Sequence, residues 1–174
     1  RIICGLVLVL GGCAGVSGPA GAEWNAGTAS VSITPLKYGW MTGYGSRNKP
    51  AEGVKQDLKV RVLALEDHDG SRALLVSAEI LGFPPDLSRS IKKRIRAELR
   101  IPEERVLLSA THTHGGPAIP QRPAMEIFHG LDERSGASIF EYAGGLSERV
   151  LEACAAALKN LRPARLEYAL APKA

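Results

Sequence analysis

Three segments of the chain alternate between apolar and polar residues, with the period of two that is typical of half-buried β-strands. They are residues 27–35 (GTASVSITP), 58–66 (LKVRVLALE) and 72–80 (RALLVSAEI). The tight-turn signal HDG at 68–70 separates the last two. We therefore predict a first strand that ends at Pro35, followed by a β-hairpin.

Apolar residues that recur at i, i+4 predict two helices. The first opens at Pro84 and Pro85, and its apolar face consists of Leu87, Ile91, Ile95 and Leu99. Its basic residues lie mainly on the other faces, which indicates a solvated surface more than contact with an anionic membrane; they are Lys92, Lys93, Arg94 and Arg96. The second helix is predicted over residues 137–161, with a stripe of Ile139, Ala143, Leu146, Val150, Cys154, Ala157 and Leu161.

Residues 105–110 (RVLLSA) predict a further short strand directly after the first helix. A strand, a helix and a strand within about forty residues form a βαβ unit, so the strands at 72–80 and 105–110 should be parallel with a right-handed crossover. A final strand is predicted over residues 164–171. The fold class is therefore α/β, a mixed sheet with a β-hairpin and a βαβ unit, flanked by helices.

Composition adds that the chain is globular, because 45% of its 174 residues are hydrophobic and 23% are charged. These proportions exclude disordered and fibrous classes. The sequence begins with Arg1 and ends at Ala174, directly after a predicted strand. We therefore expect a fragment, an incomplete part of a larger domain.

Residues 1–12 (RIICGLVLVLGG) combine a charged start with an apolar run that is too short for a membrane span of about 20 residues. This pattern predicts a signal peptide over residues 1–22. Two processing sites remain open, a lipobox (LGGC) with Cys13 as the lipidated residue, and cleavage after Ala22. The mature chain, 23–174, is expected to be exported to the periplasm, the outer surface or the medium.

Removal of residues 1–22 would lower the net charge from +4 to +3, because only Arg1 is lost. That charge is too small to indicate a nucleic-acid partner. Cys154 would then be the remaining cysteine, and its place on an apolar stripe predicts core packing and not a disulfide.

The candidate site lies in LLSATHTHGGPAIP, residues 107–120. Ligands bind at the carboxyl ends of strands in open α/β sheets, and His112 and His114 directly follow such an end. If the segment is extended, both imidazoles face one cavity and Thr113 turns away. Gly115 and Gly116 would allow close backbone approach, and Pro117 would stiffen the exit.

Two imidazoles at the end of a strand suit zinc, although a hydrogen-bonded structural role remains open. A catalytic zinc needs about three protein ligands. His68 is predicted in the hairpin turn, at the wrong end of the strand, and His129 in a loop. Glu79, near the end of the neighbouring parallel strand, could orient a histidine or pair with an arginine.

The segment LKYGWMTGYGSRNKPAEG, residues 36–53, combines glycines with Tyr38, Trp40 and Tyr44. Loops of this length are usually functional. Either it is a shaped functional loop, or its aromatic residues cover an edge of the core.

The succession of ASVSITP, GYGSR, DLKVRVLALEDHDGSRALLVSAEILGF and IPEERVLLSATHTHGGP resembles the N-terminal region of the neutral/alkaline, non-lysosomal ceramidase family over residues 27–171. The most specific part, SATHTHGGP, is similar to the family's ATHTHSGP. Gly115 stands where the motif has Ser, and Glu79 where the family commonly has Asp.

This resemblance implies an N-terminal portion of a zinc-dependent amidohydrolase that cleaves the amide bond of ceramide or a related lipid amide. His112 corresponds to a zinc ligand and His114 to a catalytic residue beside it, while the remaining ligands, a His, a Glu and a Tyr, would lie downstream. The expected partners are the lipid substrate and a membrane, through peripheral contact or a lipid anchor. The alternative function is a non-catalytic exported domain that binds lipid or glycan through Trp40 and Tyr44.

Overall fold

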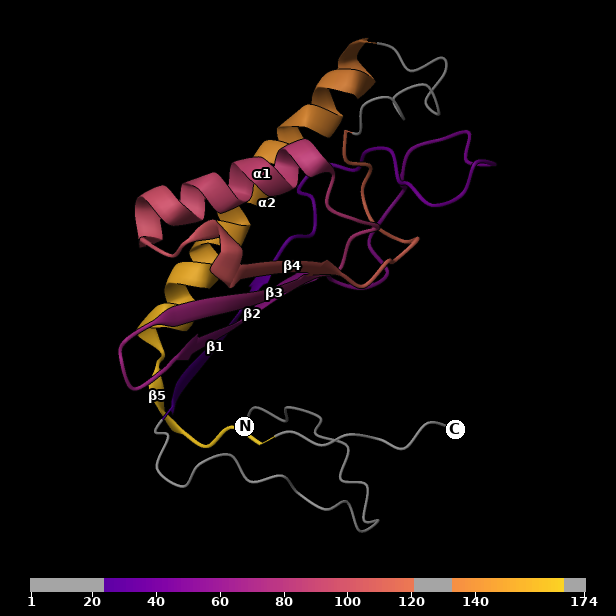
Figure 1. Cartoon of the computed structure of the whole chain (residues 1–174). Coiled ribbons are helices and arrows are strands. Elements are labelled where there is room, and N and C mark those ends of the chain that lie inside the picture. Colours follow the sequence, from indigo (N-terminus) through magenta and orange to yellow (C-terminus); the bar gives the residue numbers. More distant parts are fainter. Residues whose placement is uncertain (1–23, 121–132, 168–174) are drawn as a thin grey trace, which may run out of the picture.

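The computed structural model describes residues 24–120 and 133–167, which form a five-stranded sheet with two helices packed on one face (Figure 1). The predicted signal peptide and both of its processing sites lie outside the described residues. Within the described part of the chain, no helix combines the length and the apolar composition of a membrane span.

The strands are β1 (Trp24–Ser32), β2 (Lys59–Glu66), β3 (Arg72–Ala78), β4 (Val106–Ala110) and β5 (Arg162–Ala164), in the order β4-β3-β2-β1-β5. Only the pair of β3 and β4 is parallel among them. The mixed α/β sheet, the hairpin and the parallel strands around a helix are therefore confirmed.

Both helices differ in detail from the prediction. Helix α1 (Pro85–Arg94) continues into a π-helical turn, η1 (Ile95–Leu99), which ends at Arg100 with a left-handed φ of 59°. A short 3-10 turn, η2 (Glu103–Arg105), leads into β4. Helix α2 (Glu133–Lys159) starts before the predicted residue 137 and ends before the predicted residue 161, because an apolar stripe shows which residues face the core but not where the helix begins or ends.

Two predicted strands are wrong in their bounds. The first, 27–35, is displaced toward the N-terminus, since β1 ends at Ser32 and not at Pro35, and the last, 164–171, is shorter than predicted. β5 ends at Ala164, and residues 165–167 are not in a strand; residues 168–171 lie outside the described part. β5 pairs with β1 at the edge of the sheet, and it contains Pro163. Proline cannot donate to a ladder and is confined to such edges, which explains so short a pairing.

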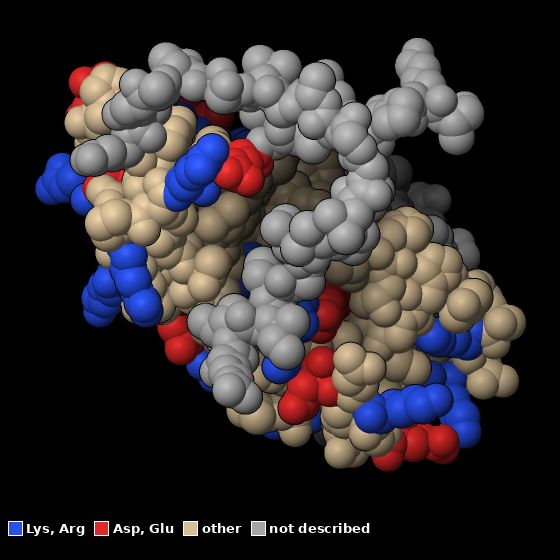
Figure 2. All heavy atoms as spheres, turned by 90° about the horizontal axis from the view of Figure 1, so that it is seen from below, with Lys and Arg blue, Asp and Glu red and all other residues tan. Residues whose placement is uncertain are grey.

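One face of the sheet forms the core with the helices. The alternate residues of β2 and β3 that face α1 and α2 are fully or almost fully buried: Val60, Val62, Ala64, Leu74, Val76 and Ala78. Cys154 on α2 is buried in the same core, and burial raises the pKa of its thiol to about 12. On the opposite face Leu75 and Leu107 are 39% and 58% exposed, and Figure 2 shows the molecule from that side.

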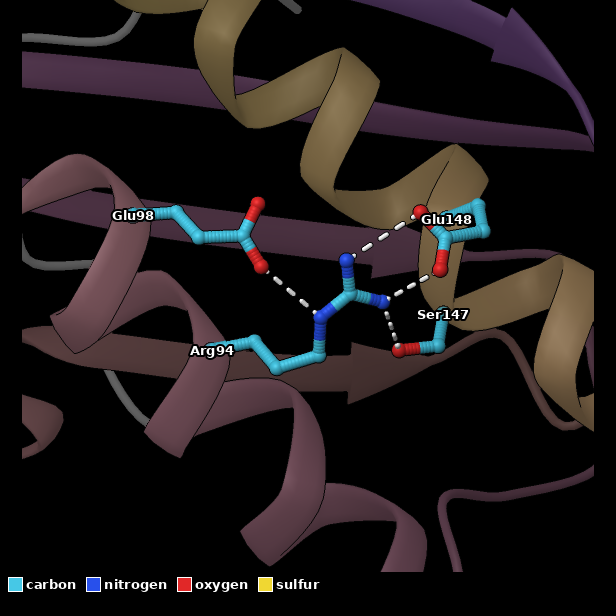
Figure 3. A network of polar contacts seen from close by, with 4 residues as sticks. All are labelled: Arg94, Glu98, Ser147 and Glu148. Atoms are coloured by element: carbon cyan, nitrogen blue, oxygen red, sulfur yellow. Dashed lines mark hydrogen bonds and ion pairs between the residues drawn. The ribbon is translucent and has the colours of Figure 1, made fainter.

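Arg94 ties α1 to α2 (Figure 3). Its guanidinium donates to both carboxylate oxygens of Glu148, at 2.6 and 3.1 Å, and to Glu98 at 2.9 Å. The hydrogen bond from Arg94 holds the pKa of the Glu148 carboxyl below its usual value. The basic cluster of α1 therefore serves in part to dock the two helices, since one of its members has partners on α2.

Candidate functional site

The parallel strands β3 and β4 end together, with Ala78 paired to Ala110. The ladder continues past their ends, because Thr111 N donates to Ala78 O at 3.0 Å and Thr113 N to Ile80 O at 3.2 Å. Residues 111–113 thus run beside 79–81. The hairpin turn with His68 lies at the opposite end of β3, as predicted.

His112 adopts a left-handed backbone conformation, with a φ of 59°. This conformation is uncommon for a residue with a Cβ atom and costs about 1 kcal/mol or more. The ring atom Nδ1 lies 2.9 Å from the carbonyl oxygen of Leu81. A carbonyl can only accept, so Nδ1 carries a proton, and in the neutral imidazole the lone pair of Nε2 is then available to a ligand.

His114 follows on the same side as His112, and their ring centroids are 5.2 Å apart. The edge-to-face contact with Tyr44 has a centroid distance of 4.8 Å. The Nδ1 atom of His114 is buried and has no hydrogen-bond partner. Buried polar atoms are nearly always paired, so an unpaired one calls for a functional explanation.

The loop of residues 36–53 packs against the histidine segment (Figure 1). Thr42 N donates to Gly116 O at 3.2 Å, and Ala118 N donates to Trp40 O at 2.8 Å. Met41 and Pro117 form an isolated β-bridge. These contacts with the histidine segment give the loop a defined shape.

Two of the three residues after the histidines pack against the protein itself. Gly116 and Pro117 are buried, whereas Gly115 is exposed. A Cβ atom on Gly116 would lie 3.3 Å from Thr113 Cγ2 and 3.6 Å from the carbonyl oxygen of Glu79. Gly116 thus lies close to the Thr113 side chain and within ordinary contact distance of the Glu79 backbone, while Pro117 is held by the bridge to Met41.

A cavity of about 1010 Å³ lies on the other side of this segment. It is lined by the end of β1, the loop after it, residues of α2 such as Tyr142, and Trp40. Among the described residues, the lining includes Thr111 and Thr113 but neither histidine. The expectation that both imidazoles face one cavity with Thr113 turned away is wrong for this cavity, because the left-handed turn at His112 breaks the alternation of an extended chain.

Glu79 pairs with an arginine, which was the second alternative for this residue. Its Oε1 accepts from Arg61 at 2.6 Å, and its Oε2 accepts from Lys59 N at 2.7 Å. Burial alone would raise the pKa of the Glu79 carboxyl, but these two hydrogen bonds outweigh it and hold the pKa below 4.5. The carbonyl of Leu81, and not Glu79, is the group that orients His112.

The residues that could complete a metal site are not gathered here. Within residues 24–120 and 133–167, no three His, Cys, Asp or Glu side chains are placed to hold one metal ion. His68 is exposed and pairs with Asp69, and His129 lies outside the described residues. No pattern in the sequence predicts the left-handed backbone at His112 or the close packing of His114. The glycines of the neighbouring loop are the one indication.

The comparisons with known proteins agree with the resemblance seen in the sequence. No family model matches the chain. It is 31% identical over 114 residues to neutral ceramidase from Drosophila pseudoobscura pseudoobscura, covering 63% of the chain and 16% of the relative. Over 104 residues it is 30% identical to neutral ceramidase from Drosophila melanogaster, covering 58% and 15%.

Two solved structures share the fold. Neutral ceramidase from Pseudomonas aeruginosa superposes with a TM-score of 0.66 at 23% identity, over 82% of this chain and 22% of that one. A ceramidase complexed with C2 matches with the same TM-score and coverage at 22% identity. The chain spans about a sixth of the curated relatives. It is thus homologous to a part of the neutral ceramidases, and its sheet and helices have the fold of the N-terminal part of the Pseudomonas aeruginosa enzyme.

Proposed function

We propose that residues 23–174 are the N-terminal portion of a zinc-dependent amidohydrolase of the neutral ceramidase type, which cleaves the N-acyl amide bond of ceramide or a related lipid amide. The observation that carries this proposal is the state of His112. Its Nδ1 donates a hydrogen bond to Leu81 O, so the lone pair of Nε2 can bind a metal ion at the carboxyl end of a parallel strand pair. The homology to neutral ceramidases supports it.

The described residues fit a zinc ion in part. A zinc-bound histidine typically donates its other ring nitrogen to a carbonyl or carboxylate, and His112 does so. The imidazole of His112 supplies a nitrogen donor of the kind that zinc prefers. A zinc ion held there would lower the pKa of its water to about 7 and would polarise the scissile carbonyl. The remaining ligands are proposed to come from polypeptide outside residues 1–174.

His114 is proposed to act on the substrate and not on the metal. Its ring lies beside that of His112 and is held edge-on by Tyr44. An imidazole in that place can donate a hydrogen bond to the oxyanion that develops at the amide carbon, and it can pass a proton to the leaving amine. Gly115, Gly116 and Pro117 would shape the backbone beside the bound amide.

The test uses the full-length protein with zinc content and hydrolysis of a fluorescent ceramide measured on the same samples. We expect about one zinc per molecule in the wild type, a large loss of zinc and activity in His112→Ala, and retained zinc with slower turnover in His114→Ala. His68→Ala is the matched control, because His68 is exposed at the other end of β3. Full zinc and full activity in His112→Ala would refute the proposal.

A second candidate function is favoured by the cavity behind the histidine segment. Its volume of about 1010 Å³ and its lining by Trp40 would suit an apolar ligand without any turnover. Tyr44, the other residue of this proposal, lies on the histidine side of the loop. A wild-type protein that binds lipid vesicles or a glycan but holds no zinc would favour this binding function.

The cellular location remains part of the proposal. Residues 1–22 are proposed to export the protein to the periplasm, the outer surface or the medium, with a lipid anchor at Cys13 if the lipobox is used. Mass spectrometry of the mature N-terminus distinguishes a lipidated Cys13 from a start after Ala22. An unprocessed N-terminus would contradict both.

A further inference from the structure

We propose that Arg47 is a positioning residue for the histidine segment, His112–His114, by clamping that segment to the loop before it. The inference concerns the same site as the proposed function and rests on it. Arg47 does not touch His112 or a reacting atom in this geometry. Its effect would pass through the backbone of His114.

Arg47 joins the two loops by two short hydrogen bonds. One guanidinium nitrogen donates to the carbonyl oxygen of His114 at 2.7 Å, and another donates to that of Thr42 at 2.6 Å. The guanidinium is a planar fork that stays charged, so both bonds are charge-assisted and their directions are fixed together. The carbonyls belong to residues 72 positions apart in sequence, by their numbers.

The same guanidinium also holds the aromatic contact of His114. Its carbon lies 5.1 Å from the centroid of the Tyr44 ring, within the range of a cation–π interaction. The other neighbour of that ring is His114, at 4.8 Å. Arg47 therefore fixes His114 twice, once through its backbone carbonyl and once through the ring that packs against its imidazole.

Gly43 gives independent evidence that this loop is built to meet His114. A Cβ atom at Gly43 would lie 2.6 Å from Cγ and 2.8 Å from Cβ of His114, closer than side chains allow. The φ of Gly43 is +106°, which also disfavours any other residue. The absence of a side chain at Gly43 thus lets the loop approach His114 closely, and the loop places Tyr44 and Arg47 around this histidine.

A clamp is needed here because the segment contains a strained residue. A left-handed His112 persists only where surrounding contacts over-determine the backbone. The hydrogen bond from its ring to Leu81 fixes one side of the segment, and Arg47 fixes the other. A displacement of about 1 Å at a catalytic group can lower turnover roughly 100-fold, so loss of the clamp should affect kcat more than KM.

The experiment compares Arg47→Ala, Arg47→Lys and the control Arg72→Ala in the full-length protein. Arg72 is also a partly exposed arginine with a short hydrogen bond, to Glu66, but it lies at the hairpin end of β3. We expect Arg47→Ala to lower kcat about 10- to 100-fold with KM changed less than about 2-fold and zinc content retained. Arg47→Lys should recover only part of kcat, because an ammonium group lacks the fork. Arg72→Ala should leave kcat unchanged.

Amide hydrogen exchange on the same samples separates this proposal from the proposed function. We expect faster exchange in both residues 39–47 and 111–118 of Arg47→Ala, with no change there in Arg72→Ala. If the wild type has neither zinc nor activity, the proposed function fails, and faster exchange in both segments would still support the clamp. Unchanged exchange in Arg47→Ala, or faster exchange with an unchanged kcat in an active enzyme, would overturn the role of Arg47.

Discussion

The two ends of strand β3 differ in which residue adopts a positive φ and in how their polar groups are paired. At the hairpin end, residues 67–71, the positive φ belongs to a glycine, Gly70, and Asp67 accepts hydrogen bonds from the amides of Asp69 and Ser71. At the histidine end, residues 111–118, the positive φ belongs to His112. There a buried nitrogen of His114 has no partner.

This difference separates requirements of the fold from those of the site. The hairpin end uses residues that meet the turn's conformation at little cost. The histidine end keeps a strained backbone and an unpaired polar atom, which together cost a few kcal/mol that folding alone does not explain. Such costs cluster at functional sites, so the histidine end is where the chemistry should lie.

The core of the sheet supports both ends of β3. A substitution in this core should therefore have the largest effect on the free energy of unfolding and should affect the two ends alike. Leu74 is fully buried in the middle of the sheet. We expect Leu74→Ala to lower the free energy of unfolding by about 2 to 5 kcal/mol, because it leaves a cavity. Urea denaturation measures this loss. A loss below about 1 kcal/mol would mean that the packing against α1 and α2 is not as described.

Gly43→Ala should sharpen the contrast at the histidine end. The new Cβ atom meets His114 and the backbone conformation is unfavourable, so we expect a loss of about 1 to 3 kcal/mol in the free energy of unfolding. Turnover should fall as well, since His114 has to move. Kinetics and denaturation on one preparation give both values, and full activity in this variant would contradict the described contact.

Gly70→Ala is the matched substitution at the hairpin end. Gly70 has a φ of +76°, but a Cβ atom there would meet nothing within 4 Å. We expect a loss of only about 1 kcal/mol from backbone strain, without any change in kcat. The comparison would break if Gly70→Ala affected kcat as strongly as Gly43→Ala.

The smallest effect is expected for the ion pair of Arg61 and Glu79. The pKa of Glu79 is below 4.5 in the folded protein, so this carboxylate stabilises the fold at neutral pH, and its contribution is lost as pH falls from about 4.5 through the lowered pKa. Arg61→Met should destabilise the protein slightly at pH 7, and the difference from the wild type should shrink below pH 4.5.

Melting temperatures between pH 3 and pH 7 test this expectation. Arg165→Met is the control, because Arg165 pairs with Glu167 and both side chains are largely exposed. A difference that grows as the pH falls would contradict the described pairing of Glu79.

The sequence was sufficient for elements that a single repeating pattern defines. The alternation in residues 58–66 and 72–80 predicted β2 and β3, and the i, i+4 spacing predicted the faces of α1 and α2 that are buried. Their ends were harder to predict, because periodicity does not say where a pattern stops. The π-helical turn after Arg94 depends on local geometry that no pattern marks, and the shortness of β5 follows from Pro163 at the edge of the sheet.

The position of the two histidines was predictable, but the geometry around them was not. The place of His112 and His114 beyond β4 followed from the topology. An extended segment would turn Thr113 away from the cavity, whereas the left-handed His112 turns it toward the cavity. The role of Arg47 was not predictable, because nothing in the sequence indicates that an arginine 65 residues before His112, by number, contacts the backbone of His114.

The most direct test of the account is a comparison of the full-length wild type with His112→Gly, measuring zinc content as isolated and the melting temperature in the presence of a chelator. Glycine takes a φ of 59° without strain. If the left-handed backbone serves the site, the variant should lose zinc and, without metal, melt at or above the wild-type temperature. A variant that keeps its zinc and melts well below the wild type would show that His112 is needed by the fold.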